Sequence, residues 1–238
     1  MYRWMWDSRS RCVDTRRVLR SLMTSETTIL DAGCGEYGLA AFMPSAKITG
    51  VDILPDEDID STFKYIHGSI IDLPFEDGSI DVTAAVDVLE HLPDDLRSAA
   101  VQQLVRVAKR AVVLSFPSGD TARQIDEDFS RALGSRVKAN PEWLDEHLAS
   151  DYPDVEQVIG QIEAASKAGD RAVKTTVFYS EPVGFSRFVR WAAARSPYFF
   201  IIGGLIGGIL IPLIPKATRK NAYRAIILAD FDEDQPNK

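Results

Sequence analysis

A short β-prone segment that leads directly into a glycine-rich turn is the sequence feature that most limits how this chain folds. Residues 27–31 end in the turn 31–35, whose sequence is DAGCG, and Gly38 follows three residues later. Glycines allow the backbone to bend sharply and to approach a ligand without a Cβ in the way. Asp52 ends a second strand candidate, where a carboxylate can accept hydrogen bonds from both hydroxyls of a ribose. The pattern predicts a nucleotide-type binding turn.

Strand and helix candidates alternate along the chain. Apolar, β-branched runs predict strands, and apolar residues that recur on one face predict helices. Because strands separated by helices of this size indicate βαβ units, we predict an α/β fold that is Rossmann-like and doubly wound, with a mainly parallel seven-stranded sheet and helices on both faces. The strand candidates are 27–31, 47–52, 63–66, 80–86, 111–116, 172–179 and 222–230, and the helix candidates are 9–23, 39–43 and 93–109.

Composition excludes several classes of protein. The 238 residues are 45% hydrophobic and 26% charged, too apolar for a disordered chain and too polar for a multi-span membrane protein. The net charge of −8 argues against nucleic acid as a partner, because phosphates require a basic face. Cys12 and Cys34 are too few for a disulfide framework or a zinc site, and no further ligands stand at metal spacing, so we expect no metal site.

Four motifs follow one another between about residues 28 and 117. They are ILDAGCG at 29–35, GVD at 50–52, LPF at 73–75 and DVLEHLP at 87–93. With this set the sequence resembles class I S-adenosylmethionine-dependent methyltransferases, in the small-molecule branch of the methyltransferase type 11 kind, which includes quinone-biosynthesis and glycan-modifying members. The resemblance implies S-adenosyl-L-methionine as the cofactor and leaves the acceptor open.

The resemblance also implies which residues bind the cofactor. Asp31, Gly33 and Gly35 correspond to positions that contact its amino-acid part. Asp52 corresponds to the ribose acceptor, and Ile53 to an apolar neighbour of the adenine.

Two further parts of the cofactor site follow from the same resemblance. Ser69 stands where the family usually has an acid that faces the adenine amino group, and Ile70 follows as the apolar neighbour. Asp87, the first residue of the fourth motif, is expected at the cofactor site as well.

The glycines by themselves also fit a dinucleotide site. Gly33, Gly35 and Gly38 match Gly-x-Gly-x-x-Gly, which pyrophosphate binders such as NAD enzymes use. Glu36, however, would lie beside the pyrophosphate and repel it, whereas a ligand with a sulfonium and an ammonium group tolerates nearby acids. The charge pattern therefore favours the methyl donor.

Candidates for acid–base chemistry are few. His91, which follows the strand 80–86, is the first candidate for a base that removes a proton from an acceptor hydroxyl, with Glu90 beside it. Alternatively, this pair only shapes the cofactor pocket or caps the helix near residue 93. His147 lies in 141–148, a segment similar to one over the acceptor in glycan-cluster methyltransferases; alternatively, it is a surface histidine.

The run 198–214 carries no charge, and basic residues flank it on both sides. As a helix it would reach about 25 Å, short of a hydrocarbon core of about 30 Å. A single crossing would also separate the strand candidate 222–230 from its sheet. We therefore favour a hairpin that dips into one leaflet or lies at the interface, with a buried or homodimer-forming helix pair and a true span as alternatives.

These observations combine into one prediction. We expect methyl transfer to an oxygen atom of a small, glycan or lipid-linked acceptor at a membrane surface, by a cytoplasmic protein peripheral to the inner face. The alternatives are a quinone-biosynthesis type C- or O-methyltransferase and a non-catalytic cofactor-binding or scaffold protein. The expected parts are a basic helical segment (1–26), the cofactor-binding core (27–117), a helical insertion over the acceptor site (118–170), the C-terminal part of the sheet (171–230) with the hydrophobic hairpin (198–215), and an acidic tail (231–238).

Overall fold

A single seven-stranded sheet forms the centre of the molecule. The computed structural model describes residues 6–59, 63–134, 139–195 and 217–231. The strands are β1 (Thr28–Ala32), β2 (Lys47–Asp52), β3 (Lys64–His67), β4 (Ile80–Val86), β5 (Ala108–Pro117), β6 (Lys174–Pro182) and β7 (Ala222–Asp230).

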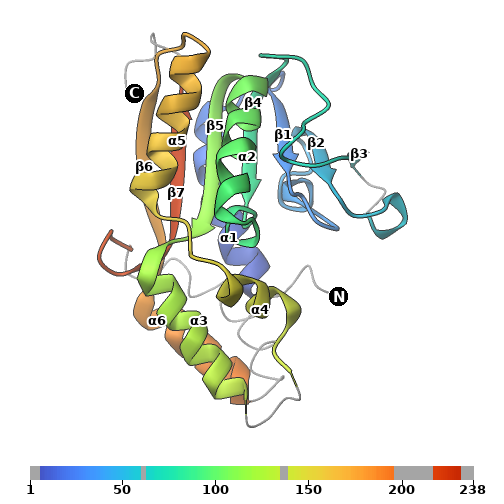
Figure 1. Cartoon of the computed structure of the whole chain (residues 1–238). Helices are drawn as coiled ribbons and strands as arrows, with labels where there is room; N and C mark the ends of the chain where they lie inside the picture. Colours follow the sequence, from blue (N-terminus) through green and yellow to red (C-terminus); the bar gives the residue numbers. More distant parts are fainter. Residues whose placement is uncertain (1–5, 60–62, 135–138, 196–216, 232–238) are drawn as a thin grey trace.

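The sheet order is β3-β2-β1-β4-β5-β7-β6 (Figure 1). β1 to β5 pair in parallel, and β7 is antiparallel to both of its neighbours. β5 is buried along most of its length, as expected for a strand covered on both faces. The predicted mainly parallel α/β fold is confirmed.

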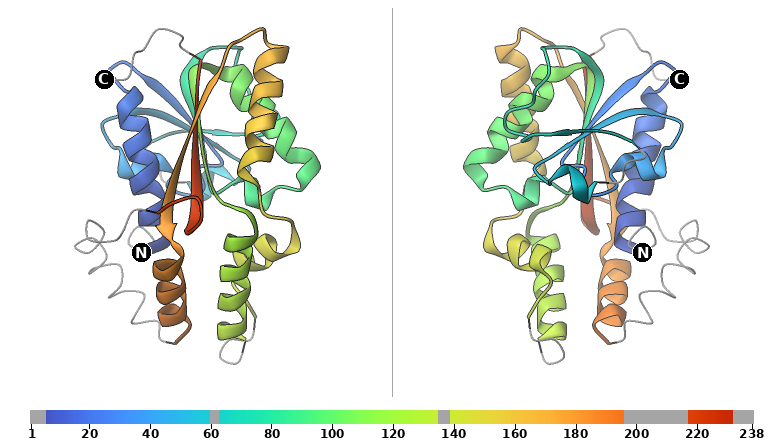
Figure 2. Two further views of the ribbon diagram at one scale, coloured as in Figure 1. Left: turned by 90° about the vertical axis from the view of Figure 1, so that its left-hand side faces the viewer. Right: turned by 90° about the vertical axis from the view of Figure 1, so that its right-hand side faces the viewer.

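Helices cover both faces of this sheet, as the two side views in Figure 2 show. α1 (Trp6–Leu22) packs on one face, where Val18 and Leu19 join a core cluster with residues of the sheet. α2 (Asp94–Val107) packs on the opposite face, and Leu104 is fully buried there. Each helix buries one apolar stripe, which is the arrangement that a doubly wound sheet requires.

The segment 118–170, expected as one helical insertion, contains one helix that packs on the sheet. α5 (Val155–Ala168) packs against α2, and its residues Val158 and Ile162 belong to the main core. α5 is therefore a regular covering helix of the sheet. Its apolar residues recur at helical spacing, so packing against the sheet gives them a better burial site than an outlying cap.

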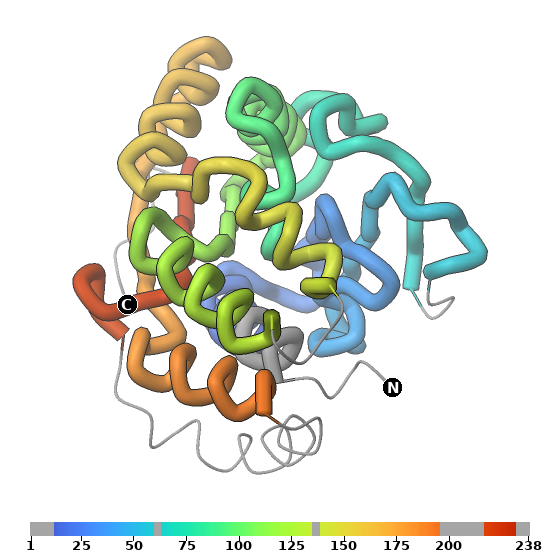
Figure 3. Tube along the Cα trace, turned by 60° about the horizontal axis from the view of Figure 1, so that its bottom comes forward, coloured from blue at the N-terminus to red at the C-terminus, as the bar shows by residue number. Residues whose placement is uncertain are grey.

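The remaining α-helices form a separate group beyond the carboxyl ends of the parallel strands (Figure 1), and Figure 3 shows this group turned toward the viewer. It consists of α3 (Gly119–Leu133), α4 (Glu142–Ala149) and α6 (Val183–Arg195). Phe129, Leu133, Leu144 and Ala194 form its apolar core. We did not predict α6 from the sequence. This group lies next to the edge of the sheet where ligands bind in such folds.

The described residues also include short 3-10 helices, which are η2 (Leu39–Phe42), η3 (Asp56–Asp58) and η4 (Leu89–His91). The uncharged run 198–214 and residues 232–238 lie outside the described residues, so the expected hairpin and acidic tail are not described here. Within the described part of the chain, no helix combines the length and apolar character needed to cross a bilayer.

Candidate functional site

The glycine turn after β1 has a backbone that other residues do not readily adopt. Gly33 has a φ of 78°, and its N–H donates to the Val51 carbonyl at 2.7 Å. A Cβ at Gly33 would lie 2.3 Å from a methyl carbon of Val88. At Gly38, where φ is 51°, a Cβ would lie 2.4 Å from an Asp31 carboxylate oxygen. Both positions therefore need glycine for space as well as for conformation.

Two acidic residues hold this turn in place. Asp31 is buried, and its carboxylate accepts the backbone N–H of Leu39 at 2.6 Å. Asp52 accepts the N–H of Gly35 at 2.8 Å with one oxygen and the N–H of Leu54 at 3.2 Å with the other. Since a carboxylate has about four acceptor positions, Asp52 keeps acceptor capacity for a ligand.

A cavity of about 580 Å³ opens beside the turn at the carboxyl ends of β1, β2 and β4. α1 contributes Cys12 to its wall, so this helix covers part of the cavity. The other lining residues are Asp31, Gly33, Cys34, Gly35, Glu36, Tyr37, Gly38, Leu39, Phe42, Asp52, Ile53, Leu54, Val86, Asp87, His91 and Glu146.

Most of the residues predicted for the cofactor site line this cavity. Ile53 is 71% exposed and lines the cavity, so its apolar side chain is accessible to a ligand there. Ser69 and Ile70 are not among the described lining residues: Ser69 pairs with Asp72 in an isolated bridge, and Ile70 is buried in the main core cluster.

The lining of the cavity is strongly acidic. Asp31, Glu36, Asp52, Asp87 and Glu146 bring carboxylates to it, and its described lining includes neither lysine nor arginine. Burial, together with the charges of nearby acids, raises the pKa of the Cys34 thiol, so this cysteine stays protonated and unreactive. A cavity of this charge suits a cationic ligand better than a phosphate.

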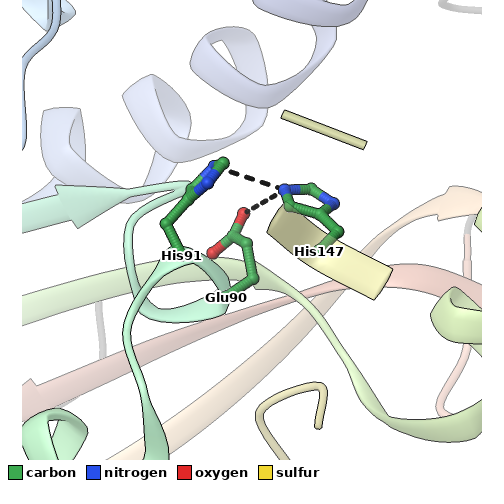
Figure 4. Close-up of side chains that lie close together, drawn as sticks. All are labelled: Glu90, His91 and His147. Carbon is green, nitrogen blue, oxygen red and sulfur yellow. Dashed lines mark hydrogen bonds and ion pairs between the residues drawn. The ribbon is translucent and has the colours of Figure 1, made fainter. Parts of the chain in front are cut away.

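A group of ionisable side chains borders the cavity at η4 and α4. The Nε2 atoms of His91 and His147 lie 3.3 Å apart, and Nε2 of His147 is 3.9 Å from Oε1 of Glu90 (Figure 4). His91 lines the cavity, whereas Glu90 and His147 are buried behind it. The structure thus brings His147 next to the adjacent pair Glu90 and His91, although His91 and His147 are 56 positions apart in the sequence.

Each of the two histidines is held by a carboxylate at its other ring nitrogen. Nδ1 of His91 lies 2.6 Å from Glu146, and Nδ1 of His147 lies 3.2 Å from Asp126. Asp126 is fully buried, and its carboxylate also accepts hydrogen bonds from the hydroxyls of Tyr152 and Tyr223. Nε of Arg190 donates to Oδ1 of the same carboxylate at 3.2 Å.

Sequence reasoning missed Glu146 and Asp126. A signal existed for Asp126, because it interrupts the apolar stripe of α3 directly after Ile125, and a charged residue in such a place needs partners. The expectation of no metal site was based on the spacing of ligand residues along the sequence, whereas the fold brings three such residues together. Glu90, His91 and His147 place three potential ligand atoms within 4.8 Å of one another.

Comparisons with known proteins find similarity to methyltransferases. A family model described as a methyltransferase domain matches residues 30–116. A protein of Encephalitozoon cuniculi that carries a methyltransferase name is 33% identical over 126 residues, 50% of this chain and 58% of that protein. The 2-methyl-6-phytyl-1,4-hydroquinone methyltransferase of Synechocystis is 31% identical over 145 residues, 50% of this chain and 45% of that enzyme. The chain thus spans about half the length of these curated relatives.

Solved structures share the fold over nearly the whole chain. A SAM-dependent methyltransferase from Archaeoglobus fulgidus has a TM-score of 0.58 at 16% identity and covers 93% of this chain and 94% of its own. Magnesium protoporphyrin IX methyltransferase from Synechocystis, solved with bound SAH, has a TM-score of 0.52 at 15% identity and covers 93% of this chain and 83% of its own. Likeness at this level of identity concerns the fold alone.

Proposed function

We propose that this chain, which contains a methyltransferase domain with the class I fold of S-adenosylmethionine-dependent enzymes, transfers a methyl group from S-adenosylmethionine to an oxygen atom of a small, glycan or lipid-linked acceptor. The acidic lining of the cavity carries the proposal. Asp31, Glu36 and Asp52 favour a ligand with sulfonium and ammonium charges and disfavour the pyrophosphate of a dinucleotide.

The residues around the cavity fit this cofactor. Gly35 leaves room for a ligand, because a Cβ built there would meet nothing within 4 Å. Asp52 keeps acceptor positions for ribose hydroxyls, and the exposed Ile53 offers an apolar surface for the adenine. We assign Asp31, Gly33 and Asp87 to the amino-acid part. Ser69 and Ile70 stand outside the lining, so we assign adenine contact to Ile53 alone.

The chemistry requires little beyond position and a proton acceptor. Bound S-adenosylmethionine supplies an electrophilic methyl group on a sulfonium sulfur. The protein holds the acceptor hydroxyl in line with that group and excludes water. We assign proton removal to His91 and Glu146, because this hydrogen-bonded pair borders the cavity. Glu90 and His147 support it from the buried side.

A quinol is the second candidate acceptor. The hydroquinone methyltransferase of Synechocystis is 31% identical over half of this chain, and this similarity makes a quinol a specific acceptor class to test. Both candidates expose a hydroxyl and have lipid-linked members, so the same cavity serves either. A scaffold without turnover is the remaining alternative, which product analysis separates from both.

Contact with a membrane surface is supported by α6, the helix that precedes the uncharged run 198–214. Phe188 and Trp191 are 60% and 51% exposed and stack on each other on its surface. The guanidinium of Arg195 lies 4.0 Å from the Trp191 ring. Exposed aromatics beside basic residues suit the headgroup region of an anionic bilayer.

The acidic lining makes a sharp test of the cofactor possible. S-adenosylmethionine is a sulfonium cation, whereas S-adenosylhomocysteine has a neutral sulfur. We expect both to bind in calorimetry while NAD does not. Glu36→Lys should weaken the binding of S-adenosylmethionine about 5-fold more than the binding of S-adenosylhomocysteine. Glu76→Lys, in an exposed turn outside the cavity, is the matched control. NAD binding, or equal loss of both ligands, would argue against the assignment.

The acceptor is sought by incubating the protein with cell extract and isotopically labelled donor, followed by mass spectrometry of the molecules that gain the label. A labelled glycolipid or quinol distinguishes the two acceptor classes. Donor binding without any labelled product would favour the scaffold.

Membrane contact is tested by flotation with vesicles that contain anionic lipid. Deletion of 198–214 and the double variant Phe188→Ser, Trp191→Ser should each reduce the floating fraction. Phe178→Ser on β6, which removes another exposed aromatic side chain, should leave it unchanged. Undiminished flotation of the deletion variant would refute this part of the proposal.

A further inference from the structure

The contact between His91 and His147 poses a question of charge. A carboxylate only accepts hydrogen bonds, so the Nδ1 atoms next to Glu146 and Asp126 act as donors. With Nδ1 protonated, the neutral form of each ring carries a lone pair on Nε2. Two such lone pairs then face each other at 3.3 Å. This arrangement is unfavourable unless a cation, either a shared proton or a metal ion, lies between them.

The third donor favours a metal ion. Glu90 is buried, and one of its carboxylate oxygens lies 3.9 Å from Nε2 of His147. In tetrahedral zinc sites with Zn–N distances of about 2.0–2.1 Å, two nitrogen ligands lie about 3.3 Å apart. The separation between His91 and His147 equals this ligand spacing. A shared proton would account for the two nitrogens, with Glu90 balancing its charge, but the separation of 3.3 Å is long for a hydrogen bond between nitrogens and matches the ligand spacing of a metal ion.

The outer contacts also match those of a metal site. Histidines that bind metals usually donate their other ring N–H to a carboxylate or carbonyl group, which fixes the tautomer and the orientation of the ring. Both histidines have such a partner, in Glu146 and Asp126. Asp126 is itself held by Tyr152, Tyr223 and Arg190. Burial and the charge of Asp126 raise the pKa of Tyr152, which keeps this hydroxyl a donor.

We propose that Glu90, His91 and His147 bind one divalent transition-metal ion, with zinc the best match. Two imidazoles and one carboxylate suit zinc and its neighbours in the first row, whereas magnesium and calcium prefer oxygen donors only. Three protein ligands leave a fourth position for water or a ligand oxygen, the usual arrangement of catalytic zinc.

The site adjoins the proposed cofactor cavity through His91. An acceptor hydroxyl in the fourth position would lose its proton more readily, because a bound metal ion lowers the pKa of coordinated oxygen. Glu146, which also lines the cavity, then remains as the proton acceptor. The metal site itself rests only on the side-chain geometry and does not require methyl transfer.

The direct test loads the full chain with Co²⁺ after removal of bound metal by a chelator. We expect one equivalent to be retained, with the visible absorption of four-coordinate cobalt, and zinc to displace it. His91→Gln, His147→Gln and Glu90→Gln should each abolish tight retention. The third histidine of the chain supplies the matched control: His67→Gln should bind as the parent does, because His67 contacts the Leu54 carbonyl outside this group.

A second variant tests the outer contacts. Asp126→Asn keeps all three ligands and should weaken cobalt binding 10- to 100-fold. Thermal unfolding of each variant separates loss of metal from loss of fold; the side chain of His91 is 30% exposed, so His91→Gln is the variant least able to disturb the core. Failure to retain cobalt or zinc, or equal retention by the parent and His91→Gln, would overturn the metal site. Calorimetry with S-adenosylhomocysteine reports separately on the proposed function.

Discussion

The guanidinium group of Arg224, buried on β7, forms an ion pair with Asp87 at the end of β4, 137 residues earlier in the chain. Arg224 also lies 3.7 Å from Glu181 on β6. Asp87 and Glu181 both have a φ of 55°, a left-handed backbone that is strained for these residues. One buried cation therefore compensates two acids at the strand ends, and one of them lines the cavity.

Removal of this cation should be costly. We expect Arg224→Met to lower the free energy of unfolding by about 3–5 kcal/mol, because it removes a buried cation from beside two buried carboxylates. Urea unfolding followed by circular dichroism measures the loss. Arg219→Met removes an exposed pair with Glu156 and should cost less than about 1 kcal/mol. If the two variants lost the same unfolding free energy, the buried ion pair would stabilise the fold no more than the exposed pair does.

The alternation of apolar runs and helical patterns was sufficient to predict the sheet and its seven strands, because each pattern is local. The turn 31–35 and Asp52 were predictable for the same reason, since the ends of parallel strands meet at one edge. The pairing of Arg224 with Asp87 was not, because it depends on β7 inserting between β5 and β6. No spacing in the sequence indicates that insertion.

The site shows the same division between local and long-range information. His91 and His147 were chosen singly, on the elements that carry them, but their mutual contact depends on how α4 folds over η4. The role of α5 was misjudged because its apolar stripe fits either a cap or the main sheet. Only tertiary packing decides such a choice.

Two glycines of the turn should respond differently to substitution. In Gly33→Ala, the new methyl group would clash with Val88, and alanine would be strained at the positive φ of this position. We therefore expect a loss of about 2–4 kcal/mol in unfolding free energy. Gly35→Ala has an unfavourable φ but open space, and should cost about 1–2 kcal/mol. Its methyl group instead enters the space where we place the cofactor. Calorimetry should therefore show weaker S-adenosylhomocysteine binding to a folded Gly35→Ala protein; unchanged affinity would move the cofactor away from Gly35.

A carboxylate at the start of β4 should make stability depend on pH. The backbone N–H of Thr28 donates to Asp81 at 2.8 Å, and this hydrogen bond lowers the pKa of Asp81. Because the folded-state pKa lies below the unfolded one, the stabilisation is complete above the unfolded pKa of about 4 and is lost as pH falls through the folded value.

We therefore expect Asp81→Asn to be less stable than the parent by about 1 kcal/mol at pH 7, with the difference vanishing in acid. Urea titrations over this pH range measure it. Asp58→Asn, on the exposed η3, should match the parent throughout. A difference that persists in acid would mean that the amide disturbs packing and that the charge of Asp81 is not the cause.

The ribose assignment of Asp52 predicts a loss of affinity for every ligand that carries the ribose. Asp52→Asn should weaken the binding of both S-adenosylmethionine and S-adenosylhomocysteine by about 10- to 100-fold, since both carry the same ribose and the variant loses a charged acceptor. Part of that loss comes through the turn, because Asp52 also accepts the N–H of Gly35. A ligand pair of adenosine and 2′-deoxyadenosine separates the two effects: the parent should prefer adenosine, and Asp52→Asn should lose that preference. If the preference persisted, Asp52 would support the turn without contacting the ribose.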